Sequence, residues 1–137
     1  MRTLVVAYDA SESAERALDR AVTLTLALAS KLVVLSVAPV VASVGRGGGG
    51  IDTLDSPDKH RAELRQARAK LEGLGIDAQY VAAVGDPGDT IVEVADQHDA
   101  DLIIVGTRAP GMVDRALHGS VSRNVSRHSH CDVLIVH

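Results

Sequence analysis

Hydrophobic and polar positions follow two patterns along this chain. Short runs rich in Val, Ile and Leu predict strands at residues 3–7, 32–37, 77–84, 101–106 and 133–136. Between them, apolar residues spaced by three and four positions predict a helix over residues 11–30, one that starts at residue 57, one marked by residues 91–98 after a turn at 85–87, and one from 119–120 to about 128. This alternation predicts an α/β fold: a single-domain, open parallel five-stranded sheet in the order 3-2-1-4-5, Rossmann-like, with helices on both faces.

Local signals refine these elements. Pro57 stands at a first helical position after Ser56, and Gly73 or Gly75 ends the same helix. Gln79 makes the third strand less apolar and therefore a candidate for the sheet edge. The uncharged stretch at residues 21–30 predicts a buried helix. The first helix presents one apolar face, made of Ala14, Ala17, Leu18, Ala21, Thr25 and Leu28.

One segment departs from both patterns. Residues 40–55 are rich in small side chains and include four successive glycines at positions 47–50, which predicts a flexible loop. The part of the chain before it is too short to form a complete fold, so we expect one domain over residues 1–137. The loop is either a lid beside a ligand site or a simple surface connection.

Composition excludes several classes of function. The 137-residue chain has a net charge of −4 and two aromatic residues, Tyr8 and Tyr80, so we expect no nucleic-acid binding. Its longest uncharged apolar stretch is well short of the roughly 20 residues that span a bilayer, so we expect no membrane insertion. The lone cysteine, Cys131, and the lack of a secretory leader pattern predict a cytoplasmic location.

The predicted strand order brings two distant loops together. Ligands of open α/β sheets bind where the strand order reverses, here between the first and fourth strands. Asp9 follows the first of these strands, and Gly119 and Ser120 open the helix after the fourth. Asp9 is either a ligand-binding carboxylate or a helix cap; Gly119 and Ser120 form either a phosphate cradle or an ordinary helix start. The loop arginines Arg108 and Arg115 either neutralise phosphate or are solvated.

No catalytic set is evident. The chain has neither a G-x-S-x-G elbow nor a G-x-x-x-x-G-K-S/T loop, so we expect no enzyme. His128, His130, Cys131 and His137 are metal-ligand types, but their predicted positions on different elements favour no metal site. A small enzyme related to nucleotidyl-transfer folds is a more distant reading.

Three blocks of residues carry a resemblance to a known family. Residues 4–11, with Asp9 and Ser11, residues 85–107, with Gly85-Asp86-Pro87, and residues 119–131 all resemble the universal stress protein family in order and spacing. The family usually has Gly where this chain has Ala10. The resemblance covers essentially the whole chain and implies an adenine nucleotide alpha hydrolase-like fold.

The resemblance also implies a nucleotide site. Nucleotide-binding members share a pattern of Gly, two residues, Gly, nine residues, Gly, then Ser or Thr; Gly106, Gly119 and Ser120 match it, and Ala109 replaces the second glycine. The implied ligand is ATP, with or without Mg²⁺, with apolar residues at the adenine, Asp9 at the ribose and the helix start at the phosphates. The residues carried over are Ala7, Tyr8, Asp9, Val37, Val105, Gly106, Ala109, Gly119, Ser120, Val121 and Ser122.

Two hypotheses about function follow. The first is an adenine-nucleotide-binding regulatory module of the stress response, with the ligand between strands one and four and slow ATP hydrolysis as a weaker extension. The second is a nucleotide-independent dimeric interaction module with protein partners not yet identified, because Ala109 departs from the pattern. In both, the resemblance implies a homodimer formed through the last strand (Val133, Leu134, Ile135 and Val136), whose edge is otherwise unpaired.

Overall fold

A parallel sheet with the strand order β3-β2-β1-β4-β5 forms the centre of the molecule. The computed structural model describes residues 2–39, 57–107 and 120–137. The predicted fold class and strand order are therefore confirmed, and the Gly-rich segment lies outside the described residues. The strands are β1 (Thr3–Ala7), β2 (Lys31–Ala38), β3 (Ala78–Val84), β4 (Leu102–Gly106) and β5 (Asp132–Val136).

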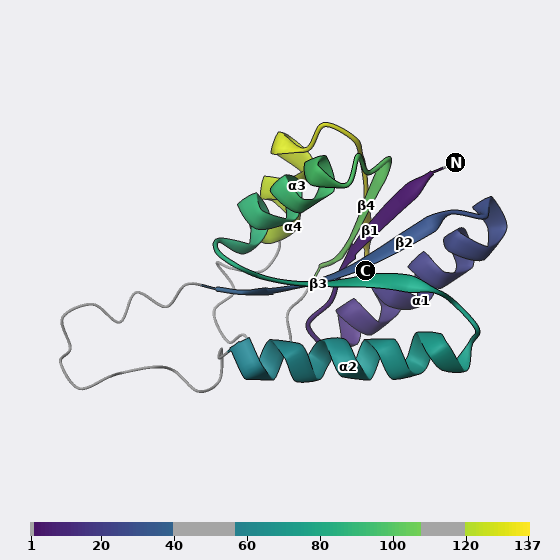
Figure 1. Cartoon of the computed structure of the whole chain (residues 1–137). Coiled ribbons are helices and arrows are strands. Elements are labelled where there is room, and N and C mark those ends of the chain that lie inside the picture. The colour runs from purple at the N-terminus through teal and green to yellow at the C-terminus, as the bar shows by residue number, and fades with distance from the viewer. Residues whose placement is uncertain (1, 40–56, 108–119) are drawn as a thin grey trace, which may run out of the picture.

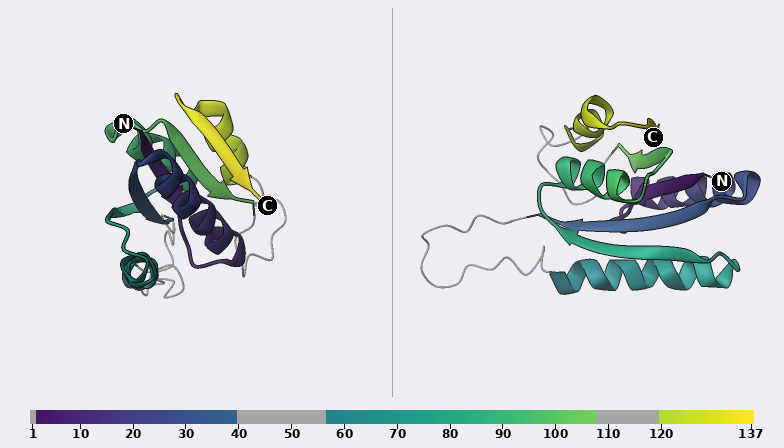
Figure 2. Two further views of the ribbon diagram at one scale, coloured as in Figure 1. Left: turned by 90° about the vertical axis from the view of Figure 1, so that its right-hand side faces the viewer. Right: turned by 45° about the horizontal axis from the view of Figure 1, so that its top comes forward.

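Four helices in the described part of the chain cover the two faces of the sheet (Figures 1 and 2). Helices α1 and α2 pack on one face, and α3 and α4 pack on the other, where they also contact each other. The helix that joins two parallel strands makes a right-handed crossover. The helices therefore change from one face of the sheet to the other at the point where the strand order reverses. The helices are α1 (Glu12–Leu28), α2 (Pro57–Gly73), α3 (Pro87–Gln97) and α4 (Ser120–His128).

The strands are apolar on both faces because each face is covered. Leu4 and Val6 of β1 join the core beneath α1 and α2, whereas Val5 joins the core beneath α3 and α4. β3 forms one edge, as its Gln79 predicted, and β5 forms the other. Among the described residues no helix is long and apolar enough to cross a membrane.

The prediction that residues 21–30 form a buried helix is wrong at its end. Leu26 is 66% exposed and Leu28, predicted to lie on the buried face, is 46% exposed. A helix of 17 residues is about 25 Å long, whereas a five-residue strand such as β1 extends only about 17 Å. The end of α1 therefore extends past the sheet, which leaves Leu28 uncovered, whereas Leu26 lies on the outer side of the helix, half a turn around it from buried Ala17.

Candidate functional site

Three of the predicted contact residues lie on one face of the sheet at its carboxyl edge. Ala7, Val37 and Val105 all join the core beneath α3 and α4, because alternate residues of a strand point the same way. They stand at the ends of β1, β2 and β4, the three central strands. Ala7 and Val37 are half-buried, and Val105 is buried. Apolar surface is thus present at the point where the strand order reverses.

The start of α4 contributes to the same face. Ser120 is the first residue of this helix, Val121 packs against the core that holds Val105, and Ser122 is buried. Backbone N–H groups in a first helical turn have no intrahelical partner and favour an anion. Ala109 and Gly119, also carried over by the family pattern, lie outside the described residues.

Asp9 braces the turn that leads from β1 into α1. Its Oδ1 accepts a hydrogen bond from the Ser11 amide at 3.0 Å, and Ser11 Oγ accepts one from the Ala14 amide at 2.9 Å. Ser11 is therefore the N-cap of α1, and Asp9 supports that cap. The Asp9 side chain is half-buried. This geometry is compatible with both interpretations of Asp9, as a support of the helix cap and as a ligand-binding carboxylate. The bond from the Ser11 amide uses one of its two carboxylate oxygens.

Gly106 has a packing role that the nucleotide pattern did not reveal. A Cβ atom at this position would lie 2.7 Å from Ser13 Oγ and 2.8 Å from the Ser13 carbonyl carbon and oxygen. Two of these three atoms belong to the backbone of α1, which cannot move away cheaply. Gly106 therefore allows β4 to approach the first turn of α1 closely.

The Tyr8 ring does not share a face with the other apolar residues that the family pattern carries over. Tyr8 lies in the core beneath α1 and α2, the face opposite to Ala7, and is 3% exposed. Its position follows from strand alternation continuing one residue past β1, since the Tyr8 amide still donates to the Leu35 carbonyl at 2.8 Å. Only the backbone of Tyr8 can therefore reach the other face.

The Tyr8 hydroxyl belongs to a polar group that sequence reasoning missed. Tyr8 Oη donates to Glu15 Oε2 at 2.6 Å, and Lys70 Nζ donates to Glu15 Oε1 at 3.2 Å. Burial, and then the Glu15 carboxylate, raise the pKa of Tyr8 well above its usual value of about 10. Glu15 looked like an ordinary acidic residue near a helix start, and Lys70 is 55 positions away, so no local pattern connected them.

The C-terminal histidines and cysteine do not converge. The His130 Nδ1 atom lies 3.1 Å from both oxygens of Asp96, and His128 Nδ1 lies 2.9 Å from the Asn124 carbonyl. Burial, and then the nearby aspartates, raise the pKa of the Cys131 thiol. Across residues 2–39, 57–107 and 120–137, no three His, Cys, Asp or Glu side chains are grouped as metal ligands.

Comparison with known proteins shows which family this chain belongs to. The model of the universal stress protein family matches residues 1–137. The chain belongs to the universal stress protein family. Among its relatives, the universal stress protein Rv1636 of Mycobacterium tuberculosis is 33% identical, over 99% of this chain and 96% of the relative. YxiE of Bacillus subtilis is 31% identical, over 97% of each chain.

Solved structures of universal stress proteins share the fold. A universal stress protein in complex with cAMP is 34% identical, has a TM-score of 0.75 and matches 99% of this chain and 97% of its own. A universal stress protein from Archaeoglobus fulgidus in complex with dAMP is 26% identical with a TM-score of 0.75, over 100% and 98% of the two chains. Both similarities extend over the whole sheet.

Proposed function

We propose that this universal stress protein binds an adenine nucleotide, ATP, at the carboxyl edge of the sheet between β1 and β4. The observation that carries the proposal is the shared face of Ala7, Val37 and Val105. They lie on the α3 and α4 face of the three central strands, where ligands of open α/β sheets bind. Nucleotide complexes of two relatives, one with cAMP and one with dAMP, support the ligand class.

Each part of an adenine nucleotide has a matching group in this chain. Half-buried Ala7 and Val37 offer apolar surface for the base, and the half-buried Asp9 carboxylate offers an acceptor for ribose hydroxyls. The first turn of α4 offers amide donors for phosphate oxygens, with Val121 holding it against the same core. In the proposal, binding alone acts as the signal, by changing the surface shown to a partner, and no catalytic step is included.

Binding is tested by isothermal titration of the purified protein with ATP and Mg²⁺, and in parallel with AMP and cAMP. Val37→Glu places a carboxylate against the base and is expected to weaken ATP binding about tenfold or more. Val84→Glu is the matched control, because Val84 is 62% exposed on the neighbouring strand. The proposal fails if the unchanged protein gives no heat at millimolar nucleotide, or if both variants bind like the unchanged protein.

Ala109 offers a separate test, because it stands where the family pattern has its second glycine. An added methyl group and a restricted backbone both disfavour close approach of phosphate oxygens. Ala109→Gly is therefore expected to tighten ATP binding. Retained affinity in the unchanged protein with no gain in Ala109→Gly would show that this loop accommodates alanine, leaving the nucleotide proposal intact.

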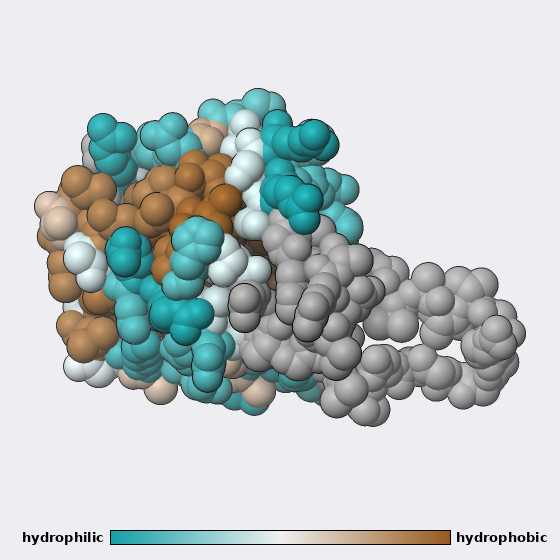
Figure 3. All heavy atoms as spheres, turned by 180° about the vertical axis from the view of Figure 1, so that it is seen from behind, coloured by the Kyte–Doolittle hydropathy of each residue, from teal (hydrophilic) through white to brown (hydrophobic). Residues whose placement is uncertain are grey.

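A second function, dimerisation without nucleotide, is favoured by a different observation. Within residues 2–39, 57–107 and 120–137, β5 pairs only with β4, and its Val133, Leu134 and Ile135 are only partly buried. The exposed Leu26 and Leu28 add to the apolar surface. Figure 3 shows a broad apolar area on the side of the molecule opposite to the view of Figure 1. An unpaired apolar edge strand is a natural surface for a second copy related by a two-fold axis.

Sedimentation at high micromolar concentration tests this second proposal. Ile135→Lys places a charge on the β5 edge and is expected to convert a dimer into a monomer. Val84→Lys places the same charge on an exposed position of the opposite edge strand, β3, and is expected to leave the dimer intact. A monomeric unchanged protein, or a dimer insensitive to Ile135→Lys, would contradict dimerisation through β5.

A further inference from the structure

The turn between β1 and α1 is held on both sides of Asp9. Before it, Tyr8 is fixed by its amide, which donates to Leu35 of β2, and by its hydroxyl, which donates to Glu15 of α1. After it, Ser11 is the N-cap of α1 and donates its own amide to Asp9. The Asp9 carboxylate therefore lies on a short turn whose two ends are anchored to different elements.

Glu15 connects this turn to α2. Its two carboxylate oxygens have different partners: Tyr8 Oη at 2.6 Å and Lys70 Nζ at 3.2 Å. Lys70 also donates to Asp19 Oδ1 at 2.6 Å, so it links α2 to two successive turns of α1. A charge-assisted bond to a carboxylate is stronger than a neutral one, and the Tyr8–Glu15 bond is shielded from water by the buried ring.

The backbone between these anchors is under strain. Ala10 has a φ of +64°, a left-handed conformation that costs a residue with a side chain about 1–2 kcal/mol. A turn of this kind persists only where its surroundings hold it in place. Tyr8 holds the end of the turn that follows β1, because its ring is buried and because both its backbone amide and its side-chain hydroxyl are hydrogen-bonded.

We propose that Tyr8, held by Glu15, is a positioning residue that sets the orientation of Asp9 toward the nucleotide. The inference rests on the proposed nucleotide site, which lies on the opposite face of the sheet from the Tyr8 ring. Tyr8 touches no ligand in this proposal: it acts through the backbone it shares with Asp9. Glu15 acts one step further away, and Lys70 of α2 fixes Glu15.

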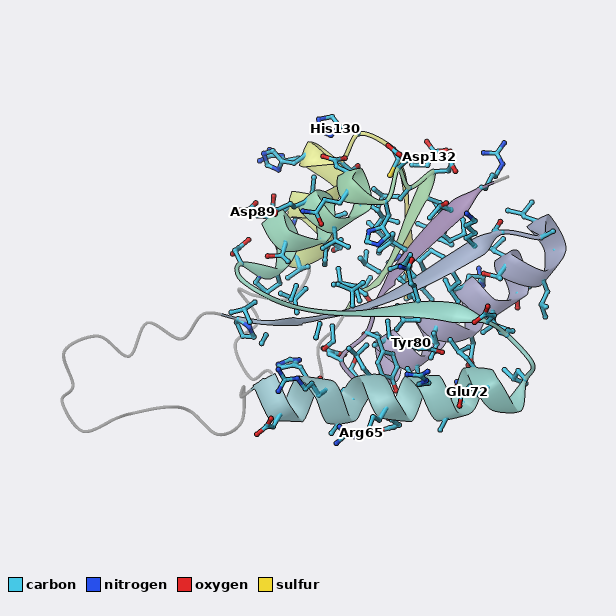
Figure 4. All side chains as sticks on the ribbon, viewed as in Figure 1. Arg65, Glu72, Tyr80, Asp89, His130 and Asp132 are labelled. Carbon is cyan, nitrogen blue, oxygen red and sulfur yellow. The ribbon has the colours of Figure 1, made fainter. Side chains whose placement is uncertain are left out.

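The two tyrosines of the chain provide a matched pair of variants. Tyr8→Phe removes the hydroxyl that bonds Glu15 and is expected to weaken ATP binding on the order of fivefold to tenfold. Tyr80→Phe makes the same chemical change on β3, where the ring lies between the strand and α2 (Figure 4). The Tyr80 hydroxyl is buried and bonds no other described residue, so this variant is expected to bind ATP like the unchanged protein.

A second pair of variants tests the other partner of the bond. Glu15→Ala removes the acceptor for Tyr8 and is expected to weaken ATP binding as much as Tyr8→Phe does. Asp19→Ala removes the other carboxylate that Lys70 binds but leaves the Tyr8–Glu15 bond in place, and is expected to bind ATP normally. Equal losses in Glu15→Ala and Asp19→Ala would overturn the proposal, since they would point to general loosening of α1 against α2.

A double-mutant cycle separates positioning from a purely structural role. In an Asp9→Asn background, Tyr8→Phe is expected to cause no further loss of ATP affinity, because the group that it positions is already impaired. A merely structural role predicts that the two losses multiply. Multiplicative losses would therefore contradict the proposal even if Tyr8→Phe alone weakened binding.

Hydrogen exchange at one amide keeps this inference distinguishable from the nucleotide proposal. The Ser11 amide bonds Asp9 Oδ1 and so reports the position of that carboxylate without any ligand. Tyr8→Phe is expected to speed exchange at Ser11, whereas Tyr80→Phe is not. If the unchanged protein binds no nucleotide, the proposed function fails on its own; if Ser11 exchange is the same in all three proteins, the positioning role fails.

Discussion

At the scale of single residues, the backbone of the β1–α1 turn is strained at the position where the family usually has glycine. Ala10 has a φ of +64°, and Ala29, the C-cap of α1, has a φ of +51°. Glycine adopts this region without a steric penalty, whereas alanine does not. The departure of this chain from the family pattern at Ala10 therefore changes the energy of the turn but leaves its shape in place.

Replacing Ala10 by glycine is expected to raise the free energy of unfolding by about 0.5–1 kcal/mol. Relief of the left-handed conformation contributes about 1–2 kcal/mol, and the greater freedom of glycine in the unfolded chain offsets about 0.4–1 kcal/mol of it. Urea unfolding measures the difference. Ala27→Gly is the control: Ala27 is exposed in the last turns of α1, where glycine is expected to lower stability. A loss of stability in Ala10→Gly would contradict the strain argument.

Gly106 gives the opposite prediction, because here the constraint is space. Gly106→Ala would place a methyl group less than 3 Å from the Ser13 backbone. The variant is expected to lower the free energy of unfolding by about 1–3 kcal/mol, as overpacking does. Gly73→Ala is a suitable control, since nothing lies within 4 Å of a Cβ atom built at Gly73. An equal free energy of unfolding for Gly106→Ala and Gly73→Ala would contradict this prediction, because it would mean that β4 and α1 move apart without loss of stability.

At the scale of elements, α1 is divided into a part that builds the core and a part that extends beyond it. Ala17, Leu18 and Ala21 are fully buried against β1 and β4, whereas Leu26 and Leu28 are exposed. Leu28 repeats the spacing of the buried residues, so periodicity alone could not separate it from them, whereas Leu26 lies half a turn around the helix from Ala17. The length of the neighbouring strands leaves Leu28 uncovered.

Two leucine substitutions in α1 measure this division. Leu18→Ala is expected to lower the free energy of unfolding by about 2–5 kcal/mol, because it opens a cavity in the core. Leu26→Ala is expected to change it by less than about 0.5 kcal/mol, because the side chain is already 66% exposed. Thermal or urea unfolding at low protein concentration, where any dimer dissociates, provides the comparison. A large loss in Leu26→Ala would indicate that the last turn of α1 is covered in solution.

At the scale of the whole molecule, the two faces of the sheet hold different groups of residues. The α3 and α4 face holds the apolar contact residues of the proposed ligand site, and the α1 and α2 face holds the buried Tyr8 with its polar partners. The two faces meet at the β1–α1 turn. In the proposal, a change in α2 therefore reaches the proposed ligand site through Glu15 and Tyr8, although α2 packs on the opposite face of the sheet.

Alkaline pH is expected to destabilise the whole fold. The pKa of Tyr8 is raised in the folded protein above its value of about 10 in the unfolded chain. The folded state therefore holds its proton more tightly, and this contribution to stability is complete below pH 10 and is lost as the pH rises toward the folded-state pKa. Tyr8→Phe is expected to show a smaller loss of stability between pH 9 and pH 11 than the unchanged protein, measured by urea unfolding at each pH. An identical pH dependence would contradict the assignment to Tyr8.

Most of the fold could be predicted from the sequence, because the information was local. Pro57 is the first residue of α2 and Gly73 its last, as their types predicted, and Gln79 marks the edge strand. The shared face of Ala7, Val37 and Val105 was also implicit, since strand alternation and the strand order together place them. Ala109 and Gly119 lie outside the described residues, so their predicted roles stay predictions.

The sequence by itself determined the strands, the helices and their order, because periodicity, caps and breakers act over a few residues and do not depend on distant partners. The tertiary structure alone decided which face Tyr8 occupies, that Glu15 and Lys70 meet, and that Gly106 is needed against Ser13. It also decided where α1 leaves the core. Each of these depends on the distance between side chains that the fold brings together from separate elements, and no local pattern encodes that distance.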